Sequence, residues 1–301
     1  MMKAVLPPKI LLDNLLKDWL LEDIGRGDRT TTGLFSADQI IPGAGYWLVK
    51  ESGVIAGLPI AARVFQLLDE KVNFVPTVIE GEWCESGTVI AKLDGPLNSL
   101  LTGERVALNL AMRLSGVATM TRKYADKIVD LSVQLVDTRK TTPGLRVLEK
   151  YATQVGGAKN HRMGLDDAVM IKDNHIAAAG GIGEAIAKVR ETIPYPLTIE
   201  VETETLAEVE TVLEYQADII MLDNMSVEVM QQAVKMIRQN NSRIKIEASG
   251  NITLDTIRNV AETGVDYIST SAPITRSTWL DLSMKIEKNI TNIVGGGKLL
   301  E

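Results

Sequence analysis

The segment IIMLDN (219–224) is the clearest indication of the fold, because an apolar run leads directly into an aspartate and an asparagine. A near-continuous apolar run is typical of a strand buried on both faces, as in a parallel sheet covered by helices. Similar runs recur along the second half of the chain, with helical patterns in most of the gaps. The predicted strands are 135–137, 169–172, 197–202, 218–223, 244–249 and 267–269, and the helices between them include 183–190, 205–213, 226–238 and 254–263. This alternation favours an α/β barrel or an open parallel sheet.

The first half of the chain has a different pattern. Short strand-like pieces at 46–49, 72–75 and 88–93 are separated by Gly, Pro and charged turns rather than by long helices, which predicts an antiparallel sheet. The remaining predicted helices are 9–21, 102–114 and 119–129. A chain of 301 residues with these two patterns is typical of a two-domain α/β protein.

Composition excludes several classes of protein. The formal net charge is −7, which argues against a surface for nucleic acid or anionic membrane. The single cysteine, Cys84, excludes an intrachain disulfide, and two histidines are too few for a multi-histidine zinc centre. No signal peptide and no apolar run of about 18 residues is found, so we expect a soluble, cytoplasmic protein.

Polar residues gather where the predicted strands end. In βα folds the loops at the carboxyl ends of the strands converge on one mouth, so these residues are expected to meet there. They comprise a cationic cluster, a pair of carboxylates and several small residues: Arg139, Lys140, His161, Arg162 and Lys172; Glu202 and Asp223; Ser249, Gly250 and Ser271.

Each of these three groups suits one part of a substrate. The cationic cluster favours a small polyanion, since arginine binds carboxylate or phosphate through two hydrogen bonds. Glu202 and Asp223 are suited to ribose hydroxyls or to Mg²⁺, and the Ser249-Gly250 and Ser271 strand-to-helix turns are suited to phosphate. Together they indicate a phosphorylated sugar and an anionic acceptor.

Several motifs resemble the quinolinate phosphoribosyltransferase family, a type II phosphoribosyltransferase family also called nicotinate-nucleotide pyrophosphorylase (carboxylating). The resemblance runs in order from about residue 20 to residue 286. Its segments are EDIGRGDRTTTGLF (22–35), GERVALNLAMRLSGVATMT (103–121), DTRKTTPGLRVLEKYA (137–152), GGAKNHRMGLDDAVMIKDNHI (156–176), IEVETETLAEVE (199–210), IIMLDN (219–224) and IEASGNITLDTI (246–257).

The resemblance implies that quinolinate and phosphoribosyl pyrophosphate give nicotinate mononucleotide, pyrophosphate and CO₂, with Mg²⁺ and no organic cofactor. It also implies an N-terminal α/β sandwich domain (1–118) with a mostly antiparallel sheet, followed by an incomplete parallel α/β barrel (119–275). The C-terminal tail (276–301) is expected to return to the first domain. Homodimers with shared active sites are expected, with a hexamer as the alternative, and no nucleic acid or membrane partner.

Residue by residue, the resemblance assigns quinolinate binding to Arg139, His161, Arg162 and Lys172, with Arg105 supplied by the neighbouring subunit. It places Lys140 near the pyrophosphate, Glu202 and Asp223 at the ribose and metal, and Ser249, Gly250 and Ser271 at the 5′-phosphate. Lys140, Glu202 and Asp223 would then be the catalytic residues. Asn251 and Ser271 stand where the family often has glycine.

Two alternatives remain open from the sequence. One is a related type II phosphoribosyltransferase with another acceptor, such as nicotinate. The other is a catalytically silent homologue that acts as a nucleotide-binding subunit. The full cationic cluster argues against the first, and the intact Lys140, Glu202 and Asp223 argue against the second.

Overall fold

The computed structural model describes residues 4–35 and 40–287 of the chain. Within these residues the chain forms two compact units, one over Met120–Ser277 and the other over residues 4–119 and 278–287, apart from the gap at 36–39. Each unit has a main sheet of its own.

The unit that contains the N-terminal part of the chain is built on an antiparallel sheet with strand order β12-β1-β5-β3. Its strands are β1 (Pro42–Val49), β3 (Asn73–Pro76), β5 (Val89–Pro96) and β12 (Leu282–Ile286), beside a small sheet of β2 (Gly53–Val54) and β4 (Trp83–Cys84). The helices of this part are α1 (Lys9–Ile24), α2 (Arg29–Leu34) and α3 (Leu58–Leu68). Alternate β1 side chains are buried, and Trp47 on that face meets the rings of Phe65 and Phe74 edge-on.

The tail 276–301 was predicted to return to the first domain, and its described part supplies an edge strand of this sheet. β12 pairs antiparallel with β1, with Met284 opposite Trp47. Residues 288–301 of the tail lie outside the described residues.

The two helices predicted over 102–114 and 119–129 are one helix, α4 (Leu97–Asp126). Ser115 and Gly116 resemble a break in the sequence but have packing roles. A Cβ on Gly116 would lie 1.9 Å from the carbonyl oxygen of Thr278, so glycine allows a close backbone approach there. The Ser115 hydroxyl hydrogen-bonds the backbone of Ala56.

The second unit contains a parallel sheet with strand order β6-β11-β10-β9-β8-β7, which confirms the predicted α/β class. Its strands are β6 (Gln134–Val136), β7 (Val169–Ile171), β8 (Ile199–Thr203), β9 (Ile219–Asp223), β10 (Lys245–Ser249) and β11 (Tyr267–Ser269). Within the part of the chain that the structure describes, β6 and β7 are the edges of the sheet, as in an open barrel.

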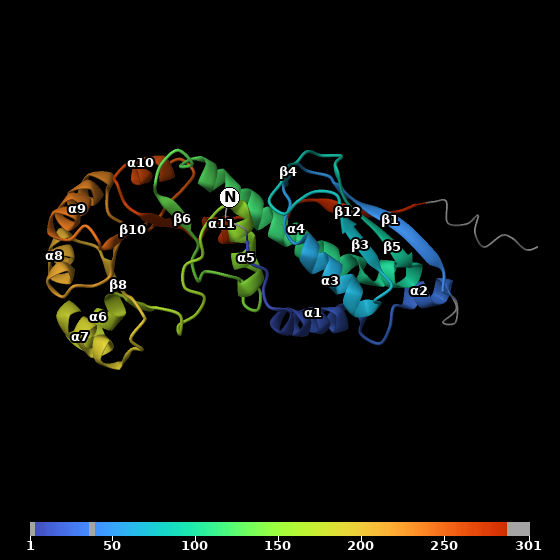
Figure 1. The fold of residues 1–301 in the computed structure, drawn as a ribbon, viewed down its shortest axis with the longest axis horizontal. Helices are drawn as coiled ribbons and strands as arrows, with labels where there is room; N and C mark the ends of the chain where they lie inside the picture. Colours follow the sequence, from blue (N-terminus) through green and yellow to red (C-terminus); the bar gives the residue numbers. More distant parts are fainter. Residues whose placement is uncertain (1–3, 36–39, 288–301) are drawn as a thin grey trace, which may run out of the picture. The chain divides into compact units, whose positions relative to one another are not determined.

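Helices cover the outer side of this sheet (Figure 1). They are α6 (Asp173–Ala179), α7 (Ile182–Thr192), α8 (Leu206–Glu214), α9 (Val227–Asn240) and α10 (Ile257–Ala261). The unit also contains α5 (Arg146–Gly156) and α11 (Ala272–Thr275). In α9 the buried Met230, Ala233, Val234 and Ile237 recur at helical spacing, and the Ser226 hydroxyl caps the first turn.

One helix is shorter than predicted. The helix expected over 254–263 is limited to α10, because Thr253 and Thr256 form a turn before it. Each threonine amide donates to the hydroxyl of the other, at 2.9 and 3.3 Å, and such side-chain bonds compete with helix formation. In the portion that the structure describes, none of the helices has the length and hydropathy that a membrane span requires.

Candidate active site

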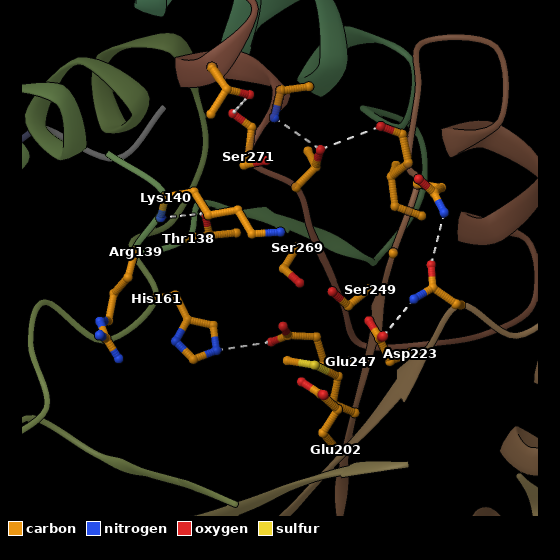
Figure 2. A pocket seen from close by; sticks show the side chains of 18 of the residues that line it. Thr138, Arg139, Lys140, His161, Glu202, Asp223, Glu247, Ser249, Ser269 and Ser271 are labelled. Atoms are coloured by element: carbon orange, nitrogen blue, oxygen red, sulfur yellow. Dashed lines mark hydrogen bonds and ion pairs between the residues drawn. The ribbon is translucent and has the colours of Figure 1, made fainter. Parts of the chain in front are cut away.

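A cavity of about 780 Å³ opens at the carboxyl ends of the parallel strands (Figure 2). It is lined by ten of the predicted site residues: Arg139, Lys140, His161, Arg162, Lys172, Glu202, Asp223, Ser249, Gly250 and Ser271. Arg105 lies on α4 in the other unit, where it is exposed. The fold therefore brings all three groups of predicted residues into one site.

The order of strands sorts these residues by chemistry. Ser271 follows β11 and Ser249 ends β10, and the next two strands, β9 and β8, carry Asp223 and Glu202. The cations follow the two edge strands, with Lys172 after β7 and Arg139 after β6. From one edge of the sheet to the other, the cavity therefore presents a cation, small residues, carboxylates and again a cation.

The cationic side of the cavity has a hydrogen-bond donor available for an anion. The Nε of Arg139 is buried and has no hydrogen-bond partner among the described residues. Burial, and then the charge of Arg139, lower the pKa of Arg162. An unpartnered buried donor beside a second guanidinium is unfavourable by itself, so this arrangement favours a bound carboxylate or phosphate.

Lys172 and Glu202 form an ion pair between the ends of β7 and β8. The Lys172 side chain is 42% exposed, so water screens the pair. His175 supports the turn behind it: Nδ1 of His175 accepts the Lys172 amide at 3.0 Å, and its own amide donates to the Lys172 carbonyl at 2.8 Å. His175 therefore orients the Lys172 loop.

Asp223 is held by a chain of two amides. The Nδ2 of Asn224 donates to one Asp223 oxygen at 2.6 Å, and Nδ2 of Asn251 donates to Oδ1 of Asn224 at 3.0 Å. Both asparagines have positive φ, of 54° and 49°, a region that asparagine tolerates better than most residues. Asn251 therefore takes part in the network around the acidic pair.

The loops suited to phosphate differ from the expectation in one respect. Ser249 and Gly250 were expected at a strand-to-helix turn, but α10 begins only at Ile257. Gly250 has a φ of 93°, and a Cβ there would lie 2.2 Å from Oδ1 of Asn224. Ser271 directly precedes α11. Loop backbone, rather than the start of a long helix, surrounds this end of the cavity.

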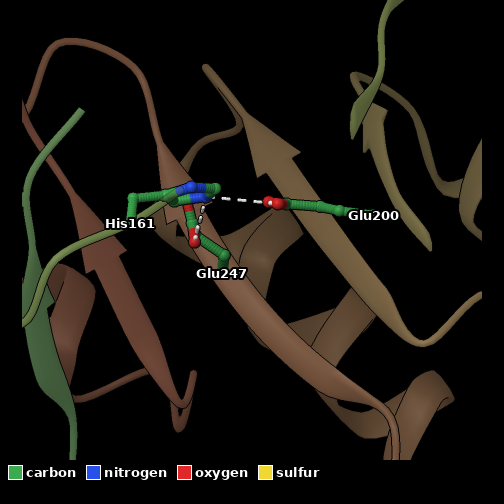
Figure 3. A group of neighbouring side chains, drawn as sticks. All are labelled: His161, Glu200 and Glu247. Carbon is green, nitrogen blue, oxygen red and sulfur yellow. Dashed lines mark ion pairs between the residues drawn. The ribbon is translucent and has the colours of Figure 1, made fainter. Parts of the chain in front are cut away.

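His161 reaches across the inside of the sheet to two buried glutamates (Figure 3). Its Nε2 lies 3.1 Å from Glu200 on β8 and 3.4 Å from Glu247 on β10, and its Nδ1 accepts the Arg162 amide at 2.7 Å. Burial opposes a proton on His161, but hydrogen bonds to the two carboxylates outweigh it and raise the pKa of His161 to about 10. Burial chiefly raises the pKa of Glu200 as well. Because Nδ1 accepts the Arg162 amide, it carries no proton, and the ring proton lies on Nε2. The additional proton that the raised pKa of His161 represents is then held by the carboxylates, of which Glu200 itself has a raised pKa.

A second buried pair holds the loops that carry the cations. Lys150, on α5, is completely buried and pairs with Asp137, directly after β6. The Asp137 carboxylate also accepts from the Thr153 hydroxyl, the Asn160 amide and the His161 backbone amide, at 2.8, 2.6 and 2.9 Å. This network ties the start of the Arg139 loop to the His161 loop.

Two charged lining residues were not predicted from the sequence. Glu247 lies within the apolar strand IEAS (246–249), two residues before Ser249 and therefore on the same face. A carboxylate inside an apolar strand could have identified it. Arg276 lies just after α11 and had no comparable local signal.

Comparisons with known proteins identify the family of the chain. The model of the C-terminal domain of quinolinate phosphoribosyl transferase matches residues 117–285, and that of the N-terminal domain matches 28–115. A probable nicotinate-nucleotide pyrophosphorylase (carboxylating) of Synechocystis is 60% identical over 94% of this chain and 95% of its own length. A protein of that name from Bacillus subtilis is 44% identical, over 91% and 93%.

A solved structure extends the similarity to the whole fold. NadC from Streptococcus pyogenes has a TM-score of 0.88 and 41% identity, and the match covers 94% of this chain and 98% of that one. The family models account for both units, and the relatives are similar over nearly their full lengths. The chain therefore belongs to the quinolinate phosphoribosyltransferase family.

Proposed function

We propose that this chain transfers the phosphoribosyl group of phosphoribosyl pyrophosphate to quinolinate, forming nicotinate mononucleotide, pyrophosphate and CO₂ in NAD biosynthesis. The observation that carries the proposal is the strand order, which places the loops suited to phosphate, the carboxylates and the cations side by side in one cavity. Relatives with 60% and 44% identity are named for this reaction.

The cations provide for the acceptor. Quinolinate carries two carboxylates at neutral pH, and burying them requires two or three positive partners. Arg139, Arg162 and Lys172 supply that number, and the unpartnered Nε of Arg139 is one donor ready for a carboxylate. A monocarboxylate acceptor such as nicotinate would leave part of this charge unmatched.

The remaining groups provide for the transfer itself. The pyridine nitrogen attacks the anomeric carbon while pyrophosphate leaves, and positive charge develops on the ribose. Glu202 and Asp223 stabilise that charge, and Lys140 offsets the charge on the leaving pyrophosphate. Ser249, Gly250 and Ser271 hold the 5′-phosphate.

Decarboxylation depends on the new bond between the pyridine nitrogen and the anomeric carbon. Once its nitrogen is alkylated, the pyridinium ring stabilises the electron pair left behind when the neighbouring carbon–carboxylate bond breaks. CO₂ leaves, and the ring carbon takes up a proton. Since the ring itself stabilises that electron pair, we infer that the step needs no organic cofactor.

Glu202 and Asp223 also fit Mg²⁺. They present hard oxygen ligands at the ends of neighbouring strands, and each uses one carboxylate oxygen for a protein partner. We infer that they hold Mg²⁺ directly or through water or substrate. When bound, the ion offsets negative charge on the pyrophosphate.

We further propose a cytoplasmic homodimer, with a hexamer as the alternative. The domains would be 1–118 with the tail 276–301, and 119–275. Arg105 is exposed on α4, which is compatible with donation to the cavity of the neighbouring subunit.

The test is a product assay on the purified chain with phosphoribosyl pyrophosphate and Mg²⁺, using quinolinate or nicotinate as acceptor. Nicotinate mononucleotide and CO₂ from quinolinate alone are expected. Turnover of nicotinate alone would show that the acceptor is wrong, and no turnover of either would favour a silent homologue. Asp223→Asn should abolish turnover, whereas Asp281→Asn, at an exposed aspartate of the other unit, should not.

A further inference from the structure

His161 has no hydrogen-bonding group left for a ligand, although it lines the cavity. Its backbone amide donates to Asp137 at 2.9 Å, and its carbonyl accepts from Nζ of Lys150 at 3.0 Å. Its Nε2 faces Glu200 and Glu247, and its Nδ1 accepts the Arg162 amide. All four polar groups of this residue are therefore engaged by the protein.

Burial of the Glu200 and Glu247 side chains is unfavourable in free energy. Their side chains are only 3% and 5% exposed, and Oε1 of each lacks a partner among the described residues. Buried carboxylates with an unpaired oxygen are unfavourable unless they serve a specific arrangement. The arrangement here is the orientation of one imidazole, because Oε2 of both residues faces the same Nε2.

The imidazole in turn fixes its neighbour. With Nε2 held from two strands, the ring cannot rotate, and Nδ1 stays against the Arg162 amide. The Arg162 guanidinium is anchored at its other end, where Nη1 donates to the Ala168 carbonyl at 2.8 Å. The position of this guanidinium in the cavity therefore depends on the ring of His161.

We propose that Glu200 and Glu247 are positioning residues that hold His161 in the Nε2–H form and, through it, place Arg162 against the acceptor. His161 then acts as a support for the acceptor site and not as a ligand of the acceptor. The effect on acceptor binding rests on the proposed function, but the state of the ring can be measured in the free protein.

The chain allows a direct spectroscopic test, since His161 and His175 are its only histidines. Nitrogen NMR of histidine-labelled protein, with His161→Gln to assign the signals, reports which ring nitrogens carry protons. We expect Nδ1 of His161 to be unprotonated at neutral pH and to stay so when quinolinate saturates the protein. A proton on Nδ1, whether before or after quinolinate is added, would overturn the proposal.

Variants of Glu247 supply the second measurement. Glu247→Ala should weaken quinolinate binding by about tenfold or more, the size expected for losing a hydrogen bond to a charged group. Phosphoribosyl pyrophosphate should bind within about twofold of wild type. Glu247→Gln keeps the shape and an acceptor oxygen, so it should restore quinolinate binding.

Equal loss of both ligands in Glu247→Ala would indicate a merely structural role and refute the proposal, as would a failure of Glu247→Gln to restore binding. Failure of the proposed function is a different result, because it would appear as absent turnover while the His161 signals remained as expected.

Discussion

Replacing Lys150 by methionine should destabilise the unit that holds the cavity far more than an equivalent change at its surface. Lys150 is completely buried, pairs with Asp137 and donates to the His161 carbonyl. Methionine fills a similar volume but leaves the Asp137 carboxylate buried without its cation. Breaking a buried pair in this way typically costs about 3–5 kcal/mol.

The matched control is Arg258→Met. Arg258 pairs with Asp130 and Glu262, but its side chain is 38% exposed and those of its partners are 60% and 53% exposed. Such surface pairs contribute about 0–1 kcal/mol. Urea unfolding of both variants, followed by far-UV circular dichroism, measures the difference directly.

A third variant tests the cause. The double variant Lys150→Met with Asp137→Asn has neither the cation nor the carboxylate of the buried pair. It should therefore regain part of the stability that Lys150→Met alone loses. If Lys150→Met loses no more stability than Arg258→Met, the reasoning from burial is wrong. If the double variant is less stable than Lys150→Met alone, the loss has a source other than the uncompensated carboxylate.

The remaining predictions concern the other unit. Arg105→Ala should raise the KM for quinolinate by about tenfold or more, because a charge-assisted hydrogen bond to a carboxylate is lost, with the circular dichroism unchanged; a wild-type KM would contradict a shared site. Asp28 caps α2 and has a lowered pKa, first through the hydrogen bond from the Thr31 hydroxyl. The ionised Asp28 carboxylate stabilises the folded state fully at pH values above about 3.9, the pKa of an aspartate in the unfolded chain. This contribution is lost as the pH falls through the lower pKa of Asp28 in the folded state. The stability difference between wild type and Asp28→Asn should therefore narrow in acid, and a difference independent of pH would refute this.

The parallel sheet was predictable because its signals are local. The apolar run IIML ends at Asp223 both in the prediction and in β9, and the other five strands were placed within a few residues. Buried parallel strands must be apolar along their length, and the loops at their carboxyl ends must hold the polar residues, so one short segment carries both kinds of information.

The parts that could not be predicted depend on contacts between distant residues. Gly116 resembles a helix break until the Thr278 backbone is seen against it. His161 suits a ligand contact by sequence, but its ring nitrogens are occupied by groups 39 and 86 positions away as well as by its neighbour Arg162. The direction of a side chain inside a barrel is decided by strand order, which the local pattern does not contain.

Strand order also explains how opposite charges coexist in one cavity. The carboxylates of Glu202 and Asp223 lie on inner strands, while Arg139, Lys140 and Lys172 follow the two edge strands, so most of these cations are kept apart from the carboxylates. The exception is Lys172 with Glu202, whose strands β7 and β8 are neighbours and whose side chains do pair. Because Lys172 is partly exposed, this pair contributes at most about 1 kcal/mol. Exchanging it for an acceptor carboxylate on Lys172 and a ribose or metal contact on Glu202 therefore costs little, so the proposed substrates can separate the one pair of charges that the fold leaves in contact.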